Sequence, residues 1–355
     1  MALNCEKTIN IYFVANPLHY LAAKAIASNI ETQGKQILVW YKPELEQIVE
    51  KEKWDIAFYM PWPRLDPLPG FCGRIKRQLQ NIELIGKLVK YCDTLNIHSA
   101  VFDTEAINYF LHALPNTCNI KQLNARIIPD GLLNTRRHPL SLSKRLLQYF
   151  KKLRLLYDKR LSYSCFSGDR IGSDAPFCDR IYVLHGLPNQ YPPEKTVTLP
   201  SILNTNNMSG TKGKKRALVV GQPLTGFNLA SAANMHSITT EINLWLNNHG
   251  YSEIDYKSHP KDPNKELFCP EYNELQLSEP LETWMSKTEY DVIAGVHSTV
   301  LLLSKLIYGS KARALAFGLD RIKFKSNREQ SDIINTFNTC GIEIISPVSH
   351  RETDE

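Results

Sequence analysis

The chain has no long hydrophobic segment and no closely spaced cysteines. Its 355 residues contain no run of 18 apolar residues, and the apolar stretch within residues 1–17 is too short for a signal peptide. The eight cysteines are scattered, without a C-x-x-C pair or metal-ligand spacing. These absences argue against a membrane-spanning, secreted or zinc-binding protein. We therefore expect a cytoplasmic protein with reduced thiols, soluble or at most peripheral on a membrane.

Several ligand-binding patterns are also missing. The sequence has neither G-x-G-x-x-G nor the P-loop pattern, so a dinucleotide or ATP fingerprint is not supported. The formal net charge is only +6, from 42 Lys and Arg against 36 Asp and Glu. That excess is too small to indicate nucleic acid as a partner, and it leaves an anionic ligand or a membrane surface open.

The chain does contain two series of alternating strand-like and helical segments. Such alternation predicts parallel sheets covered by helices on both faces. In the first half the expected strands are 9–15, 36–41, 55–60, 99–104, 125–130 and 179–186, and the expected helices include 74–92 and 105–114. In the second half the pattern restarts in segments 216–224, 252–260, 290–309 and 312–318.

A polar segment separates the two halves. It is rich in Asn, Ser, Thr, Gly and Lys and poor in large apolar residues, as an exposed linker is. We predict an N-terminal Rossmann-like domain at 1–198, a linker at 199–215 and a C-terminal Rossmann-like domain at 216–355. Open α/β sheets bind ligands beyond the carboxyl ends of their strands, so we expect the ligand between the two domains.

Polar residues follow apolar strands at several places. In the first half, Asp130 and Gly131 come shortly after Ile127 and Ile128. A carboxylate held there by a turn that needs glycine can serve as a general base. The alternative is a plain Asp-Gly turn, which is a common pair.

In the second half, His259 and Pro260 end a strand between Lys257 and Lys261. The proline biases His259 towards an extended backbone, which fixes the direction of the imidazole, and the lysines favour a nearby anion. A surface strand end with solvated lysines is the alternative.

A further strand runs into Ser298 and Thr299, which open an apolar helix. Backbone N–H groups, hydroxyls and the positive end of the helix dipole together make a seat for phosphate, whereas a simple helix cap is the alternative. Gly221, Gln222 and Pro223 add a glycine and a side-chain amide at another strand exit.

The order of these motifs resembles the bacterial sialyltransferases, which include lipooligosaccharide, O-antigen and capsular polysialic acid enzymes. Their hallmarks are an acidic-acidic-Gly motif, a His-Pro motif and a Ser-Ser/Thr motif. The segment "NIYFVANPLHYLAA" is also similar to their -PLQ- loop, with His19 in place of the glutamine. In the first motif Pro129 stands where the family has an acidic residue, so only Asp130 can carry the role.

The resemblance implies a two-domain GT-B glycosyltransferase with a cleft between the domains, CMP-sialic acid as donor, and inverting transfer without a metal or other cofactor. The absence of an Asp-x-Asp sequence agrees with metal independence. Asp130 is then the base for an acceptor hydroxyl, and His259 acts on the leaving phosphate with Lys257 as an electrostatic helper. The implied CMP-binding set is Gly221, Gln222, Pro223, His259, Pro260, Ser298 and Thr299.

The implied acceptor is a bacterial surface glycan, such as O-antigen, lipooligosaccharide or capsule, and lipid-linked at the inner membrane. Two alternatives stay open. One is a transferase or epimerase that uses another nucleotide sugar, and the other is a glycan- or nucleotide-binding protein without catalysis.

Residues 143–161 combine Leu, Tyr and Phe with seven basic residues. A basic amphipathic helix of this kind can lie on anionic lipid, where a lipid-linked glycan is presented. The alternative is a surface helix that turns its leucines to the core.

Overall fold

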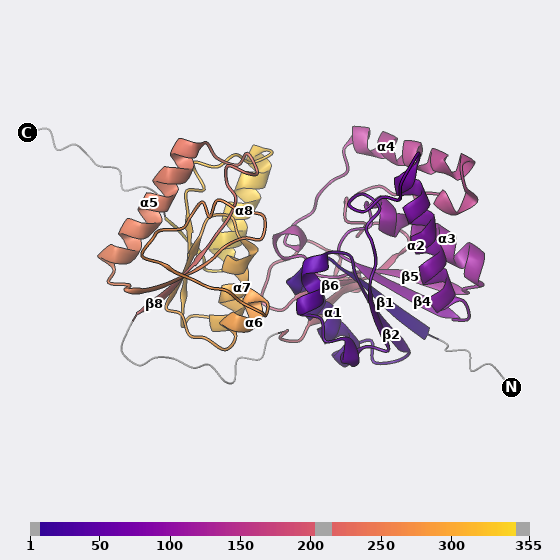
Figure 1. Ribbon diagram of the computed structural model, residues 1–355, viewed down its shortest axis with the longest axis horizontal. Coiled ribbons are helices and arrows are strands. Elements are labelled where there is room, and N and C mark those ends of the chain that lie inside the picture. Colours follow the sequence, from indigo (N-terminus) through magenta and orange to yellow (C-terminus); the bar gives the residue numbers. More distant parts are fainter. Residues whose placement is uncertain (1–7, 203–214, 346–355) are drawn as a thin grey trace, which may run out of the picture. The chain divides into compact units, whose positions relative to one another are not determined.

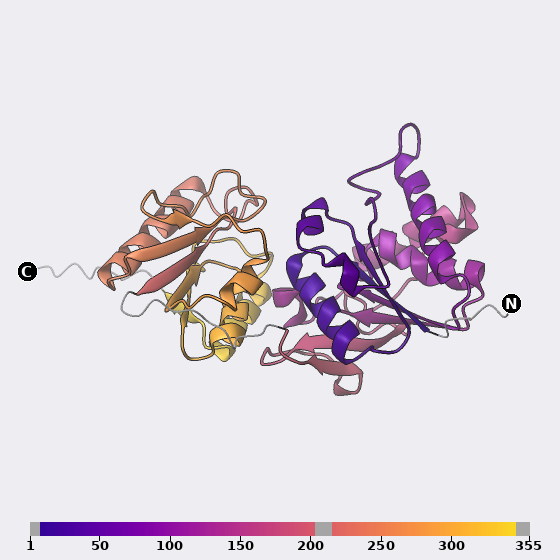
Figure 2. The ribbon, with the colours of Figure 1, turned by 60° about the horizontal axis from the view of Figure 1, so that its bottom comes forward.

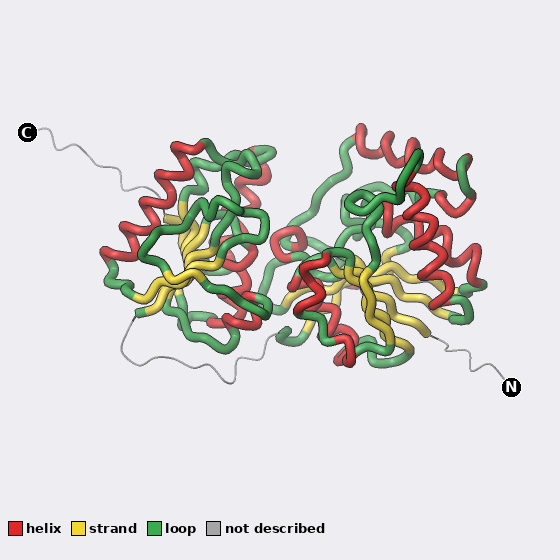
Figure 3. Tube along the Cα trace, viewed as in Figure 1, coloured by secondary structure: helices red, strands yellow, loops and turns green. Residues whose placement is uncertain are grey.

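The computed structural model describes residues 8–202 and 215–345. Within them the chain forms two compact units, one of residues 8–185 and 189–202 and the other of residues 186–188 and 215–345. Each unit is built on a parallel sheet with helices around it, as Figure 3 shows in yellow and red. Residues 203–214, most of the predicted linker, lie outside the described residues.

The first unit contains a seven-stranded sheet in which all pairs are parallel. Its order is β3 (Ile56–Tyr59), β2 (Lys35–Trp40), β1 (Thr8–Val14), β4 (Thr94–Ser99), β5 (Gln122–Ile127), β6 (Cys178–Leu184) and β7 (Thr196–Leu199). Its helices are α1 (Pro17–Asn29), α2 (Gly73–Val89), α3 (Glu105–Cys118) and α4 (Leu142–Lys152). Its 3-10 turns are η1 (Pro43–Gln47), η2 (Lys51–Lys53), η3 (Gly131–Asn134), η4 (Leu153–Leu156), η5 (Lys159–Leu161) and η6 (Pro193–Lys195).

The strand order places the helices on two faces of this sheet. The chain steps outward from β1 to β3 and then returns to β4 on the other side of β1. Because crossovers between parallel strands are right-handed, this reversal puts α1 on one face and α2 and α3 on the opposite face (Figures 1 and 2). The core under α3 includes Phe13 of β1, whose ring stacks on Phe110 at 5.2 Å.

One predicted strand of this unit is wrong. Residues 99–104 were expected to form a strand, but β4 ends at Ser99 and the rest of that segment is the loop before α3. The true strand carries Asn96 and His98, which are buried. Asn96 donates to Asn10 Oδ1 (2.7 Å) and accepts from Asn124 Nδ2 (2.8 Å), so a row of amides replaces apolar side chains on this face and conceals the strand from a hydrophobic pattern.

The second unit has a six-stranded parallel sheet. Its order is β10 (Asn273–Glu274), β9 (Glu253–Lys257), β8 (Arg216–Val220), β11 (Val292–Gly295), β12 (Arg313–Phe317) and β13 (Glu343–Ile345). Its helices are α5 (Ala232–Asn248), α6 (Leu281–Met285), α7 (Thr299–Tyr308) and α8 (Asn327–Thr339). The strand order reverses between β8 and β11, and a sheet of this type binds ligands beyond the carboxyl ends of the strands at such a reversal.

Two further predictions concern the state of the cysteines and the lack of membrane-spanning segments. The seven cysteines within the described ranges are all free thiols. Across the same ranges, no helix has both the length and the apolar character needed to cross a bilayer.

Candidate active site

In the first unit, Asp130 contacts two side chains that follow β1, Asn16 at the N-cap of α1 and His19 in its first turn. Its Oδ1 accepts a hydrogen bond from Asn16 Nδ2 (3.0 Å) and lies 2.9 Å from His19 Nε2. Asn16 also caps α1, because its Oδ1 accepts from the backbone N–H of His19 (2.8 Å). The carboxylate, the amide and the imidazole are therefore fixed together at the carboxyl edge of the sheet.

The tautomer of His19 follows from its other nitrogen. Nδ1 accepts from the backbone N–H of Ala15 (3.2 Å), so a neutral ring carries its proton on Nε2, which faces Asp130. The His19 side chain is 4% exposed and that of Asp130 is 30% exposed. Burial alone would raise the pKa of Asp130, but the charge of His19 and the contacts with His19 and Asn16 outweigh it and lower that pKa.

The turn after Asp130 holds the carboxylate in place. Gly131 has φ of 58°, a left-handed conformation that favours glycine, and it begins η3. The backbone N–H of Asp130 donates to the side chain of Asn134, at the end of the same turn. The predicted Asp-Gly turn exists, and it presents a carboxylate that is bound to two other polar side chains.

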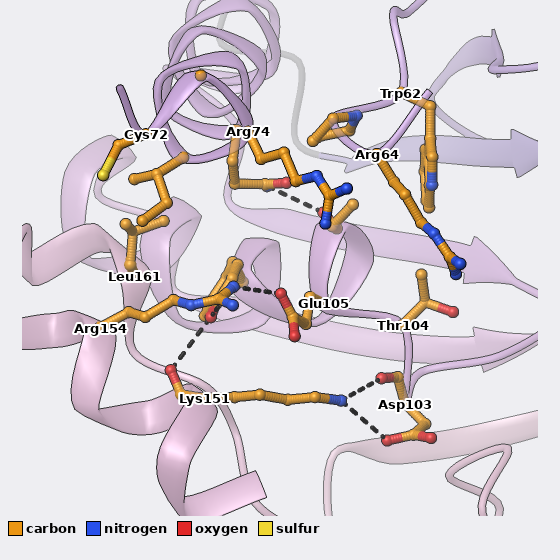
Figure 4. A pocket seen from close by; sticks show the side chains of 16 residues that line it. Trp62, Arg64, Cys72, Arg74, Asp103, Thr104, Glu105, Lys151, Arg154 and Leu161 are labelled. Atoms are coloured by element: carbon orange, nitrogen blue, oxygen red, sulfur yellow. Dashed lines mark hydrogen bonds and ion pairs between the residues drawn. The ribbon is translucent and has the colours of Figure 1, made fainter. Parts of the chain in front are cut away.

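A pocket of about 780 Å³ lies in the same unit (Figure 4). It is formed by the loop after β3, the start of α2, the start of α3, the end of α4 and the segment that follows α4. Its polar and charged lining includes Arg64, Arg74, Gln78, Asp103, Thr104, Glu105, Lys151 and Arg154.

The charges of this pocket differ between its two sides. Lys151 lies 3.5 Å from Asp103 Oδ1, and Arg154 pairs with Glu105. Arg64 and Arg74 are exposed, and neither has an ion pair with any described residue. In Figure 4, Arg64 lies beside Trp62, and Arg74 extends from α2 towards it. The pocket therefore offers two free cations to an anionic ligand.

Aromatic side chains connect this pocket with Asp130. Trp62 lines the pocket, and its ring stacks on Tyr41 with 4.1 Å between centroids. Burial first, and then the nearby Asp130 carboxylate, raise the pKa of Tyr41. The stacked rings thus link the pocket lining to the surroundings of the carboxylate.

In the second unit, the loops after the neighbouring strands β8 and β11 are joined directly. The side chain of Gln222 is 9% exposed, and its Oε1 accepts from the backbone N–H of His297 (3.0 Å). Gly221 lies against β9, where an added Cβ would come within 2.4 Å of Tyr256 Oη. These two residues of the predicted CMP-binding set thus shape the strand exit.

His259 lies in the loop directly after β9 and is half-buried. Its Nδ1 accepts from the backbone N–H of Lys261 (3.0 Å), so a neutral ring carries its proton on Nε2. Its ring also makes an edge contact with Phe227 at 5.9 Å. Burial, and secondarily Lys261, lower the pKa of His259, which leaves a neutral donor at neutral pH.

Ser298 and Thr299 occupy the start of α7. Ser298 is the N-cap, and its Oγ accepts from the backbone N–H of Val300 (3.2 Å). Thr299 is the first helical residue, and both side chains are partly exposed. Ser298 therefore does cap the helix, as the alternative interpretation expected. Its hydroxyl hydrogen stays available to a second acceptor.

A buried carboxylate ties two loops of this unit together. Glu266 is 7% exposed and accepts from the backbone N–H of Thr225 (2.8 Å), the Thr225 hydroxyl (2.5 Å) and the backbone N–H of Gly226 (3.2 Å). Thr225 and Gly226 follow Pro223 in the loop after β8, whereas Glu266 belongs to the loop after His259. We name this set of contacts the Glu266 clasp.

The predicted site residues thus form two groups. Asp130 belongs to the first unit. The second unit carries the remaining residues, at the carboxyl ends of the adjacent strands β9, β8 and β11: Gly221, Gln222, Pro223, Lys257, His259, Pro260, Ser298 and Thr299.

Sequence reasoning missed several of the contacts. Asn16 was not selected, although an asparagine before Pro17 at a predicted helix start is a recognisable cap signal. His19 was identified only as the residue in place of the glutamine of the -PLQ- loop, and its contact with Asp130 was not predicted. The pocket residues come from segments spread over about 100 positions and form no local motif.

The sequence profile of the alpha-2,8-polysialyltransferase family matches residues 10–316. The chain belongs to this family. The match includes all the site residues described above, from Asn16 to Thr299. This polysialyltransferase-family protein is therefore a glycosyltransferase of the sialyltransferase type, as the motifs had indicated. No curated protein gives a significant match to the chain.

Solved structures show the fold of this family member. It is similar to the calicheamicin glycosyltransferase CalG4 (TM-score 0.52, 9% identity, covering 96% of this chain and 86% of that chain). It is also similar to the glycotransferase of kitacinnamycin (0.50, 10%, 96% and 86%) and to UDP-GlcNAc 2-epimerase from Neisseria meningitidis bound to UDP-GlcNAc (0.50, 8%, 95% and 94%). At such low identity the likeness concerns the fold alone, and it confirms the predicted two-unit α/β fold of the GT-B type.

Proposed function

We propose that this protein transfers a sialyl group from CMP-sialic acid to a hydroxyl of a bacterial surface glycan, with inversion and without a metal ion. The observation that carries the proposal is the Asp130 carboxylate, held through Oδ1 by Asn16 and His19. Among the described residues, no side chain or backbone group hydrogen-bonds to its Oδ2. This second oxygen is therefore available to an acceptor hydroxyl.

On the acceptor side, the hydroxyl oxygen forms a bond to the anomeric carbon while its proton passes to Asp130. The pKa of Asp130 is lowered, so the carboxylate is ionised at neutral pH and ready to accept a hydrogen bond. Its negative charge also favours the positive charge that develops on the sialyl group as the donor bond weakens.

On the donor side, the bond between the anomeric carbon and the phosphate oxygen breaks, and CMP leaves with the electron pair. His259 presents an Nε2–H that no described residue accepts, so it can donate to the leaving phosphate. Ser298 and Thr299 add hydroxyls at the N-terminus of α7, and Lys257 adds positive charge.

The pocket with Arg64 and Arg74 is our candidate for the part of the acceptor next to the reacting sugar. Its two unpaired cations favour a glycan that carries carboxylate groups, as sialosides do. We expect sialosides to be better acceptors than neutral galactosides. The variant Arg64→Gln/Arg74→Gln should lower the transfer rate with sialosides more than the rate with galactosides. A neutral galactoside makes no ion pair with either arginine, so its rate should change little.

The central experiment combines CMP-sialic acid with a panel of labelled galactosides and sialosides. Release of CMP together with a longer labelled glycan supports the proposal, and chromatography of the product separates single transfer from polymer formation. UDP- and GDP-sugars are tested in parallel. Turnover of one of these sugars but not of CMP-sialic acid would identify the alternative transferase or epimerase, and binding without any product would identify a non-catalytic protein.

A further inference from the structure

Helix α4 exposes an unusual amount of apolar surface. Among the described residues, eight of the fourteen exposed large hydrophobic side chains lie between positions 142 and 157. They are Leu142, Leu146, Leu147, Tyr149, Phe150, Leu153, Leu156 and Tyr157, and each is at least 55% exposed. Monomeric soluble proteins rarely expose an apolar cluster of this kind, because it favours association.

The orientation of α4 explains this exposure. Leu142, Leu146 and Phe150 recur every four residues and so share one side of the helix. Gln148, two residues after Leu146 and thus about 200° around the axis, is buried and accepts from the backbone N–H of Phe166 (2.9 Å). The helix therefore turns a polar side to the protein and its apolar side outward.

This orientation contradicts one expectation from the sequence. The alternative in which the leucines face the core is wrong, because the leucine side is exposed. The predicted helix 143–161 is also shorter than expected, since α4 ends at Lys152 and the chain continues through η4 and η5.

Basic side chains accompany the apolar surface. Lys144, Arg145 and Lys152 are exposed on α4, and none of them has an ion pair with a described residue. Residues 131–157 include seven Lys and Arg and not one Asp or Glu. The surface is therefore both apolar and strongly cationic.

We propose that α4 and η4 dock on an anionic lipid surface, with the leucine and aromatic side chains inserted at the boundary between headgroups and acyl chains. An amphipathic helix with basic residues beside its apolar face binds such surfaces through buried apolar area and attraction to anionic lipids. The cations disfavour a second copy of the chain, because a two-fold contact would bring like charges together.

The same segment also reaches the pocket described above. Lys151 at the end of α4 and Arg154 of η4 line the pocket, while their neighbours on the outer side are exposed (Figures 1 and 4). Docking through α4 would bring the pocket close to the bilayer. A lipid-linked acceptor, if the proposed function holds, would then be presented next to its binding site.

The test measures sedimentation of the full chain with vesicles of phosphatidylcholine alone and with vesicles that contain one quarter phosphatidylglycerol. We expect binding to the anionic vesicles and weaker binding at high salt. The variant Lys144→Gln/Arg145→Gln/Lys152→Gln should lose about fivefold in affinity for each charge removed. The variant Leu142→Gln/Leu146→Gln/Phe150→Gln should lose about tenfold or more.

The matched control is Leu84→Gln/Tyr91→Gln/Leu244→Gln, which removes three exposed apolar side chains elsewhere. It should bind vesicles as the unmodified chain does. Because all the replaced side chains are exposed, thermal unfolding should change little in each variant. Equal binding by the control and the leucine variant would overturn the proposal. A dimer that the leucine variant abolishes, without vesicle binding by the unmodified chain, would assign this surface to a second copy instead.

Discussion

His19 and His259 are held in the same way but have different surroundings. In both rings Nδ1 accepts a backbone N–H, from Ala15 in one and from Lys261 in the other, so each neutral ring carries its proton on Nε2. In His19 that Nε2 faces the carboxylate of Asp130 at 2.9 Å. In His259 no described residue accepts from it.

The difference separates a positioning group from a ligand-binding group. His19 is buried and acts on Asp130, whose pKa it helps to lower. His259 is half-buried and has a free donor at the end of β9. Two different local arrangements, a helix start for His19 and a loop for His259, thus give the same tautomer, which faces an internal carboxylate in the first unit and is free for an external anion in the second.

The largest effect is expected at the carboxylate that His19 serves. Asp130→Asn should lower transfer by ~10²-fold or more while CMP binding and thermal stability change little, because the variant keeps the shape and removes the base. Initial rates and calorimetric titration with CMP measure the two quantities. Asp93→Asn, at a surface ion pair, is the control. Turnover close to that of the unmodified enzyme would exclude Asp130 as the base.

The second prediction removes the free donor. His259→Ala should weaken CMP binding by ~10-fold or more and lower turnover, since hydrogen bonds to charged groups contribute about 1.5–3 kcal/mol. His249→Ala is the control, because that ring contacts Trp245 of α5, through a hydrogen bond to its carbonyl and stacking at 3.8 Å, away from the carboxyl ends of the strands.

The same variant also has a pH signature. The pKa of His259 is lowered in the free protein, and a bound phosphate favours the protonated ring, so CMP affinity should rise as the pH falls towards the lowered pKa of the free protein. His259→Gln should remove this part of the pH dependence. Identical pH profiles for the two proteins would contradict contact between His259 and phosphate.

The third prediction tests the start of α7. If Ser298 and Thr299 hold phosphate, Ser298→Ala/Thr299→Ala should weaken CMP binding by roughly 1–3 kcal/mol and leave cytidine binding nearly unchanged. If they only cap the helix, the variant should lose ~1 kcal/mol of stability with no change in CMP affinity. An equal loss for CMP and cytidine would mean that the helix itself had moved.

A smaller effect is expected at His19. His19→Ala should raise the pKa of Asp130, because it removes a group that lowers that pKa. His19→Gln, which restores the glutamine of the related loop, should raise it less because the amide can still donate. Carbon NMR titration of the side-chain carboxyls measures both. The stability that the ionised carboxylate contributes should then be lost at a higher pH in His19→Ala than in the unmodified chain.

The smallest effect is expected from metal removal. Transfer should survive excess EDTA, because the proposed chemistry at both histidines uses only protons and hydrogen bonds. Loss of activity with EDTA and its recovery with Mg²⁺ would contradict the metal-free mechanism.

The sequence predicted most strands and the strand ends that carry Asp130 and His259. It did not predict the contacts between distant segments. Periodicity identified most strands, and the Asp-Gly and His-Pro pairs marked two strand exits. Periodicity failed at β4, because the buried side chains Asn96 and His98 are polar, with Asn96 in amide hydrogen bonds and His98 stacked on Tyr12. The contact between His19 and Asp130 depends on which strands lie side by side, and no local pattern encodes that order. In α4 the sequence pattern correctly predicted an amphipathic helix. It did not show which side of that helix faces the core, and in the structure the leucine side is exposed.

The Glu266 clasp bears on how a nucleotide enters the second unit. One carboxylate accepts three hydrogen bonds from the loop after β8 and belongs to the loop that follows His259, so neither loop can rearrange without breaking those bonds. The conformational entropy of both loops was therefore lost when the chain folded. A ligand that binds here meets a preorganised seat, so more of its interaction energy remains as affinity.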